Sequence, residues 1–223
     1  MKNDFGVLFD MDGVIVHSNP AHKEAINIFC DKHDIAIDEQ YMKSSIYGRA
    51  NKEWIPKIFG DISEERMQEL ADEKEQIFRD LFDPDEMKVP GIIEFLDHLK
   101  EEQIKVVVAT SAPGANADFI LNELAIYDYF DAVLDSSHVT HSKPHPEAYI
   151  NAAEAIDLTP QQCIVIEDSV SGIKSGLAAG AVVIGVATTH THEELSSCHL
   201  VIDNFEAFTL DHLIGLMELN EQE

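Results

Sequence analysis

Short apolar runs recur along the chain, and most of the stretches between them have helical spacing of apolar residues. Six runs have the length and β-prone composition of strands: residues 6–9, 105–109, 132–134, 163–166, 182–186 and 200–202. Helical patterns cover residues 91–102, 116–124, 146–156 and 169–179. This alternation of strand and helix predicts an α/β fold with a doubly wound parallel sheet.

One segment breaks the alternation. Residues 20–82 have only helical patterns, with Asn19 expected as the N-cap of the first helix and Pro20 at its first position. We therefore expect a small all-helical domain, residues 17–87, inserted after the first strand of a core formed by residues 1–16 and 88–223. A crevice between the two would lie over Asp10 and Asp12. The C-terminal "ELNEQE" is expected to be a frayed acidic end.

Composition indicates a globular cytoplasmic protein. Hydrophobic residues make up 45% of the 223 residues and charged residues 26%. Cys30, Cys163 and Cys198 are far apart, as expected for reduced thiols. Acids interrupt the N-terminal segment, so no signal peptide is expected there. The apolar run of residues 177–187 is shorter than the 18 or so residues of a membrane-spanning helix.

The net charge of −27 argues against nucleic-acid binding, which needs patches of lysine and arginine. An anionic substrate would need a site made locally positive by a metal ion and a few cations. We expect a small-molecule partner, no membrane partner, and a monomer or weak oligomer.

Polar residues follow four of the predicted strands or the loops after them. They are Asp10 and Asp12, Thr110 and Ser111, Lys143, and Glu167 and Asp168. Any one alone is more often a turn residue than a site residue. The pair of aspartates could also start a calcium loop, but the fifth and twelfth positions of such a loop would be Val14 and Ala21, which excludes it.

Taken together, these groups indicate phosphoryl chemistry. Carboxylates gathered at one point repel each other and need a cation, and an all-oxygen ligand set suits Mg²⁺. A lysine and a threonine hydroxyl nearby suit a phosphoryl group. Asp10 can then be a nucleophile, while Asp12 protonates the leaving oxygen and later activates water.

Four ordered motifs, "DMDGVI", "TS", "SKPHPE" and "IEDSVSGIKSG", resemble those of the haloacid dehalogenase superfamily. The helical block resembles the cap of its β-phosphoglucomutase-like subgroup, which includes small sugar-phosphate phosphatases. The resemblance implies an aspartyl-phosphate on Asp10 and general acid–base catalysis by Asp12. It implies phosphoryl binding by Thr110 and Lys143, and Mg²⁺ binding by Asp10, the Asp12 backbone carbonyl, Glu167 and Asp168. The acidic residue at position 12 separates the chain from phosphonatases.

The cap gives finer clues. His22 lies twelve residues after Asp10, as the cap histidine of β-phosphoglucomutase does, although an ordinary surface histidine remains the alternative. Gly48 and Arg49 resemble the cap's specificity loop, but Asn51 stands where the mutase has its arginine. After Thr110 and Ser111 the mutase has a lysine near the phosphate site, and the matching residue here is Asn116. Both departures weaken the assignment as a mutase.

Lys74 fills a gap in the apolar stripe formed by Met67, Leu70, Ile77 and Leu81, so its side chain is expected to point inward. The alternative is a lysine whose ammonium reaches the rim. His138, His141 and His145 flank Lys143 and could line the site, but they are expected to be loop residues. The HxH pair at 190 and 192 is not expected to bind metal.

The sequence thus predicts a Mg²⁺-dependent phosphatase that acts on a small sugar phosphate through an aspartyl-phosphate. The first alternative is a hexose-phosphate mutase of the β-phosphoglucomutase type. An alternative of another class is a phospho-accepting signalling domain, whose acceptor aspartate follows a middle strand and which has no inserted cap. The sequence does not identify the sugar.

Overall fold

The computed structural model describes residues 5–46, 49 and 51–220. The strands are β1 (Gly6–Phe9), β2 (Lys105–Ala109), β3 (Ala132–Leu134), β4 (Cys163–Glu167), β5 (Val182–Val186) and β6 (Leu200–Ile202). The helices are α1 (Asn19–Lys32), α2 (Glu39–Ser45), α3 (Asn51–Phe59), α4 (Glu64–Leu81), α5 (Pro84–Met87), α6 (Ile92–Glu101), α7 (Gly114–Glu123), α8 (Glu147–Glu154), α9 (Val170–Ala179) and α10 (Leu210–Asn220). Three short 3₁₀ turns are η1 (Tyr127–Tyr129), η2 (Ser136–His138) and η3 (Pro160–Gln162).

The chain divides into two compact units, Met1–His17 with Pro84–Glu223, and Ser18–Asp83. We call them the sheet unit and the helical unit. The boundary places the short helix α5 with the sheet unit. Each unit has its own core of apolar side chains.

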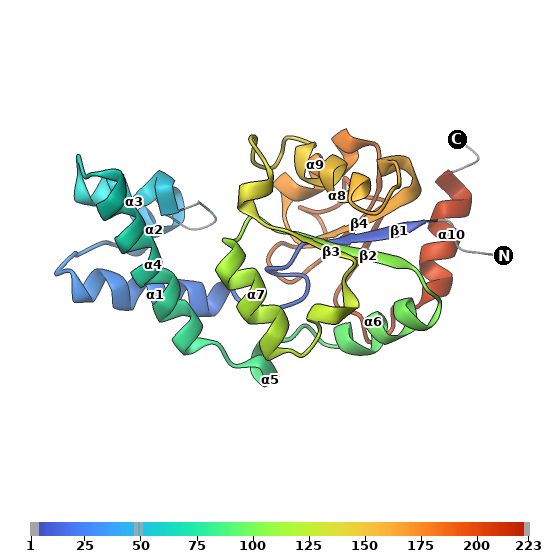
Figure 1. Ribbon diagram of the computed structural model, residues 1–223, viewed down its shortest axis with the longest axis horizontal. Coiled ribbons are helices and arrows are strands. Elements are labelled where there is room, and N and C mark those ends of the chain that lie inside the picture. The colour runs from blue at the N-terminus through green and yellow to red at the C-terminus, as the bar shows by residue number, and fades with distance from the viewer. Residues whose placement is uncertain (1–4, 47–48, 50, 221–223) are drawn as a thin grey trace. The chain divides into compact units, whose positions relative to one another are not determined.

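The six strands form one parallel sheet in the order β3-β2-β1-β4-β5-β6. Its central strands are buried on both faces, which is why they are continuous apolar runs rather than alternating ones. Helices α8 and α9 cover one face, and α6 and α7 lie on the other (Figure 1). The predicted doubly wound parallel sheet is confirmed.

The two faces of β1 show how the layers are held together. The side chain of Leu8 packs in a cluster with Tyr149 of α8 and Ile173 of α9. On the opposite face, the ring of Phe9 lies 6.3 Å from that of Phe95 in α6 and 6.5 Å from that of Phe205. Successive residues of a strand point to opposite faces, so this short strand joins both helical layers.

The order of the strands determines where a site can form. The chain moves from β1 to β2 and β3 on one side, then crosses to β4 on the other side of β1. Phe9 is in register with Val108 of β2 and with Ile166 of β4. Residues that follow these three strands therefore come out at one edge of the sheet, at the point where ligands bind in open α/β sheets.

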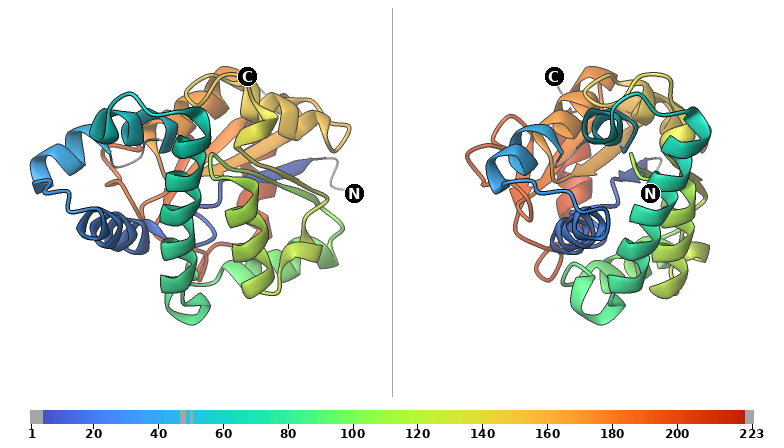
Figure 2. Two further views of the ribbon diagram at one scale, coloured as in Figure 1. Left: turned by 60° about the vertical axis from the view of Figure 1, so that its left-hand side comes forward. Right: turned by 90° about the vertical axis from the view of Figure 1, so that its left-hand side faces the viewer.

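The helical unit has no strand among its described residues, and Figure 2 shows its helices in blue to green. Its core includes Phe29 of α1, Trp54 of α3 and Leu70 of α4. The indole ring of Trp54 meets the ring of Phe29 edge-on at 5.8 Å. Ser63 caps α4 by accepting a hydrogen bond from the Arg66 amide at 3.2 Å.

Two local predictions are wrong. The N-cap of α1 is Ser18 rather than Asn19, so Pro20 is the second helical residue; no side-chain hydrogen bond marks this cap. Residues 218–220 of the C-terminal segment are helical rather than frayed, because α10 continues to Asn220, and the remaining residues 221–223 lie outside the described residues. The helix continues because its apolar residues pack on the sheet, and Leu213 is buried.

Candidate active site

Asp10 follows β1 directly and lies at the carboxyl edge of the sheet. Its backbone N–H donates to the carbonyl of Ile166 at 2.9 Å, which extends the pairing of β1 with β4 by one residue. The side chain is buried, and only 8% of the residue's surface is exposed. Burial raises the pKa of this carboxyl well above its ordinary value, and the charges of Glu167 and Asp168 raise it further, although Lys143 opposes both.

Lys143 joins the carboxylate that follows β1 to the one on the last residue of β4. Its ammonium donates to Asp10 Oδ1 at 2.6 Å and to Glu167 Oε1 at 2.7 Å. It also donates to the carbonyl of Ala109 at 3.0 Å and to the hydroxyl of Tyr149 at 2.9 Å. Burial alone would lower the pKa of this amine, but the charges of Asp10 and Glu167 raise it instead, so Lys143 carries its charge at neutral pH.

Both carboxylate oxygens of Glu167 accept hydrogen bonds. Oε1 accepts from Lys143 and, at 2.8 Å, from the Tyr149 hydroxyl. Oε2 accepts from the backbone amides of Asp168 and Ser169, each at 3.1 Å, and from the Ser169 hydroxyl at 3.0 Å. Despite burial, Lys143 and these donors lower the pKa of Glu167 below its ordinary value, so the group is ionised and held in one orientation.

The start of α9 is built around this carboxylate. Ser169 is the N-cap, and its Oγ accepts from the Gly172 amide at 3.0 Å. A side chain at position 172 would collide with the carboxylate of Glu167. Glycine is therefore required in the first turn of α9 so that Glu167 can occupy its place.

Asp168 completes the acidic cluster. Burial raises its pKa to about 7, and the charges of Glu167 and then of Asp12 add to this effect, while Thr189 opposes it. The ring of His190 bonds the Asp168 carbonyl at 3.0 Å, so the segment after β5 supports this residue. Gly13, with φ of +83°, faces the Asp168 carboxylate, and a side chain there would clash with it.

The donors of Asp10, Glu167 and Asp168 fit a hard divalent cation. One oxygen from each carboxylate lies within 4.8 Å of the others, and the three residues are buried. Burial raises the pKa values of Asp10 and Asp168, and the neighbouring charge of Glu167 raises them further, while Lys143 opposes these effects. An all-oxygen cluster of this kind suits Mg²⁺ rather than a soft metal.

The other predicted core residues lie around this cluster. Asp12 is half-buried and close enough to Asp168 for its charge to raise the pKa of that carboxyl. Thr110 follows β2 and is buried, and its hydroxyl accepts from the Ala112 amide at 3.0 Å. Ser111 is exposed, and Asn116 is buried in the first turn of α7.

In the helical unit, His22 and Lys74 form a pair. The Lys74 ammonium lies 3.0 Å from His22 Nδ1 and 3.0 Å from Glu75 Oε1, and the residue is only 4% exposed. The expectation that Lys74 points inward is confirmed. The ring of His22 stacks on that of Phe78 at 3.8 Å. Because a charged ammonium can only donate, Nδ1 of His22 accepts, and the ring proton is assigned to Nε2.

Arg49 is exposed and bonds within its own unit. Its guanidinium donates to the Ser44 carbonyl at 3.1 Å and lies 4.0 Å from Glu53 Oε2. Asn51 is held at both ends, because it donates to Glu75 at 2.6 Å and accepts from the Trp54 indole at 3.2 Å. Gly48, the other residue of the expected specificity loop, lies outside the described residues.

Three groups that support the cluster were not predicted from the sequence. Tyr149, Ser169 and His190 each bond a residue of the site, as described above. Tyr149 lies among apolar residues at helical spacing, and its ring is buried in the core. Ser169 belongs to the fourth motif, but its role as cap and donor appears only in three dimensions. His192, the other histidine of the HxH pair, lies 2.8 Å from Asp203.

The sequence model of the haloacid dehalogenase-like hydrolases matches residues 6–180, which include β1 and all residues of the acidic cluster. The chain belongs to the haloacid dehalogenase-like hydrolases. The predicted family is therefore confirmed.

Two characterised relatives and one solved structure are similar to this chain over most of its length. Hexitol phosphatase A of Escherichia coli (strain K12) is 32% identical over 215 residues, which are 92% of this chain and 93% of that protein. The β-phosphoglucomutase of Bacillus subtilis (strain 168) is 33% identical over 189 residues, 81% of this chain and 82% of that protein. The crystal structure of β-phosphoglucomutase from Clostridium difficile superimposes with a TM-score of 0.82 at 29% identity, covering 98% of this chain and 99% of that one.

These relatives confirm the expected resemblance to the β-phosphoglucomutase-like subgroup, and they support a phosphoric monoester hydrolase. None of the described helices is both long enough and apolar enough to cross a membrane.

Proposed function

We propose that the protein is a Mg²⁺-dependent phosphatase that hydrolyses a small sugar phosphate or related phosphorylated polyol through an aspartyl-phosphate on Asp10. The observation that carries this proposal is the double contact of Lys143 with Asp10 and Glu167, within a buried cluster that also contains Asp168. The sequence similarity to hexitol phosphatase A supports the substrate class.

In the first step, a carboxylate oxygen of Asp10 attacks the phosphorus atom, and the bond from phosphorus to the sugar oxygen breaks. Asp12 gives its proton to that leaving oxygen. Lys143 keeps the Asp10 carboxylate in one orientation. Its positive charge, together with the Thr110 hydroxyl, stabilises the negative charge of the phosphoryl group that is transferred. In the second step, Asp12 takes a proton from water, the water oxygen attacks phosphorus, and the bond to Asp10 breaks to release phosphate.

Mg²⁺, when bound, would neutralise charge on the transferring phosphoryl group and on the acids that surround it. Asp10, Asp168 and the backbone carbonyl of Asp12 would hold it. Glu167 would be a further ligand of the ion and would add negative charge. Because its oxygens already accept hydrogen bonds from Lys143, Tyr149 and the turn into α9, we assign it the further task of orienting these groups.

We assign residues 18–83 the role of a cap that excludes water in the first step and selects the leaving group. His22, Lys74 and Arg49 are its proposed contacts with the substrate, while Ser111 and Asn116 belong to the phosphate side. Mutase activity is the second candidate, because the B. subtilis β-phosphoglucomutase is 33% identical to this chain.

A panel of sugar and polyol phosphates, assayed for phosphate release, tests the proposal. We expect activity with Mg²⁺, loss of activity in EDTA and recovery when Mg²⁺ is restored. Asp10→Asn should abolish turnover while its melting curve remains cooperative. Full activity after the metal is stripped would overturn the assignment of the site. A coupled assay with β-glucose 1-phosphate and a bisphosphate primer separates a mutase from a phosphatase.

A further inference from the structure

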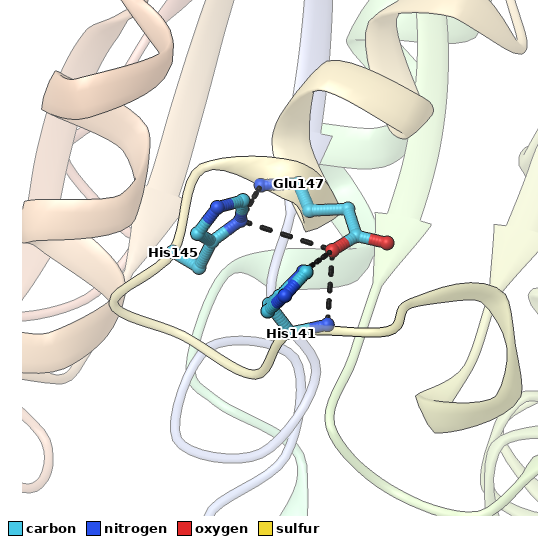
Figure 3. Close-up of side chains that lie close together, drawn as sticks. All are labelled: His141, His145 and Glu147. Carbon is cyan, nitrogen blue, oxygen red and sulfur yellow. Dashed lines mark hydrogen bonds and ion pairs between the residues drawn. The ribbon is translucent and has the colours of Figure 1, made fainter.

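A second group of potential metal ligands lies outside the acidic cluster. His141 and His145, on the loop that leads into α8, come together with Glu147, the first residue of that helix (Figure 3). His141 Nδ1 lies 2.8 Å from Glu147 Oε2, and His145 Nδ1 lies 3.8 Å from the same oxygen. The centroids of the two imidazole rings are 4.5 Å apart. Both histidines are exposed to solvent, so an ion can reach them.

We propose that His141, His145 and Glu147 bind one divalent transition-metal ion of the zinc, copper or nickel type. Imidazole nitrogen with one carboxylate is the donor set these ions prefer, whereas Mg²⁺ takes oxygen ligands. Zinc ligands stand about 2.0–2.2 Å from the metal, so two of them in a tetrahedron are roughly 3.3–3.6 Å apart. The two separations from Glu147 Oε2, 2.8 and 3.8 Å, lie on either side of this range.

The ligands are already held close to the positions they would need. Glu147 Oε1 accepts from the Thr140 amide at 2.7 Å, and Oε2 accepts from the His141 amide at 2.9 Å. The carbonyl of His145 accepts from the Ser175 hydroxyl of α9 at 2.7 Å. On binding, the metal would take the place of the proton in the hydrogen bond between His141 Nδ1 and Glu147 Oε2. His145 Nδ1 would give up the long hydrogen bond of 3.3 Å that it accepts from the Glu147 amide. Such supporting contacts raise metal affinity because less order is lost on binding.

Among the described residues, the acidic cluster around Asp10 is the other group of three such side chains. The two sites differ in chemistry, because one offers only oxygen and the other offers two nitrogens. Saturating Mg²⁺ should therefore occupy the acidic cluster and leave the histidine site open. This difference allows the two sites to be titrated separately in one protein.

The test uses untagged full-length protein in excess Mg²⁺. Isothermal titration with Zn²⁺ should give one site, and Cu²⁺ bound to the same protein should show nitrogen hyperfine coupling in its electron paramagnetic resonance spectrum. His141→Gln and His145→Gln should each weaken Zn²⁺ binding at least tenfold. His98→Gln, which removes an exposed histidine on α6, is the matched control and should bind as the wild type does.

Melting curves of the variants establish that each remains folded, as expected for exposed positions. Glu147 is left unchanged because its carboxylate also closes the loop. Unaltered Zn²⁺ affinity in the double variant His141→Gln/His145→Gln would overturn the proposal. A copper spectrum without nitrogen coupling, or no binding heat from the wild type in Mg²⁺, would overturn it as well.

Discussion

Lys143 Nζ lies 2.6 Å from Asp10 Oδ1, although 133 residues separate the two in the sequence. The same ammonium bonds Glu167, so one cation is shared by two buried carboxylates. A shared buried charge of this kind orients its partners, and its removal leaves them without compensation.

Lys143→Ala should therefore reduce both activity and stability. We expect kcat/KM to fall about 100-fold or more, as for the loss of a preorganised group at the site of reaction. The melting temperature should fall more in EDTA than in Mg²⁺, because the ion replaces part of the missing charge. Lys174→Ala, at an exposed position of α9, is the matched control. Activity above about a tenth of wild type, a loss of less than ~1.4 kcal/mol, would remove Lys143 from the catalytic group.

The raised pKa of Asp168, about 7, predicts how the metal-free protein responds to pH. In the unfolded chain this carboxyl loses its proton near its ordinary value of 3.8, but in the folded protein it keeps the proton until about pH 7. Between these two pH values the folded state therefore binds more protons than the unfolded state. The contribution of Asp168 to the free energy of unfolding falls as the pH rises through that window. Each pKa unit of the difference corresponds to about 1.4 kcal/mol at most.

Melting curves in EDTA should thus give a lower melting temperature at pH 8 than at pH 5. Mg²⁺ should raise it more at pH 8, where the acids are ionised and bind the ion. In Asp168→Asn the EDTA curves should depend less on pH. If wild type and Asp168→Asn respond to pH and Mg²⁺ alike, Asp168 does not hold the ion.

Tyr149→Phe tests a positioning residue. The hydroxyl accepts from Lys143 at 2.9 Å and donates to Glu167 at 2.8 Å, whereas the buried ring belongs to the core. Phenylalanine keeps the ring, so the substitution removes only hydrogen bonds to charged groups, about 1.5–3 kcal/mol. We expect a lower melting temperature, a lower kcat with a small change in KM, and a higher Mg²⁺ requirement.

Tyr127→Phe, at an exposed tyrosine of η1, is the control for the loss of a hydroxyl. A Tyr149→Phe variant with lower stability but an unchanged kcat and Mg²⁺ requirement would make this residue structural only.

The sequence alone predicts the sheet and most of the acidic cluster, but not all of the residues that support the cluster. The sheet was predicted because each of its strands is a short β-prone apolar run, and adjacent parallel strands bring Asp10, Thr110 and Glu167 to one edge. Lys143 was predicted from its place in the loop after residues 132–134, but its contacts with both Asp10 and Glu167 appear only in three dimensions. Tyr149 was missed because its position fits the apolar face of α8. The partner of its hydroxyl, Glu167, belongs to another element, β4. A hydroxyl of this kind is recognised only once β4 and α8 are placed together.

The prediction of a frayed C-terminal segment was also wrong up to Asn220, because local sequence does not show tertiary packing. Leu210–Asn220 form α10, but acidic residues follow its apolar positions closely, so the local pattern favoured a frayed end. Tertiary packing of Leu213 decides in favour of the helix.

Lys74→Ala tests the proposed cap. If the ammonium contacts the substrate, kcat/KM should fall by the equivalent of about 1–3 kcal/mol, as for a charge-assisted hydrogen bond. Stability should also fall, because Glu75 is buried and lies 3.0 Å from Lys74, so it would lose its cation. The double variant Lys74→Met/Glu75→Gln removes both charges and should recover much of the melting temperature but none of the kcat/KM. Recovery of both would mean that Lys74 serves only the helical unit.

The central claim is that Asp10 becomes phosphorylated during turnover. Rapid quenching of the enzyme with Mg²⁺ and its best panel substrate, followed by borohydride reduction, converts an acyl phosphate on aspartate into homoserine. Mass spectrometry of the peptide that contains residue 10 should find homoserine at this position in wild type only when substrate is present, and none in Asp10→Asn. Product formed at the normal rate with Asp10 unmodified, or homoserine at Asp12 instead, would contradict the account.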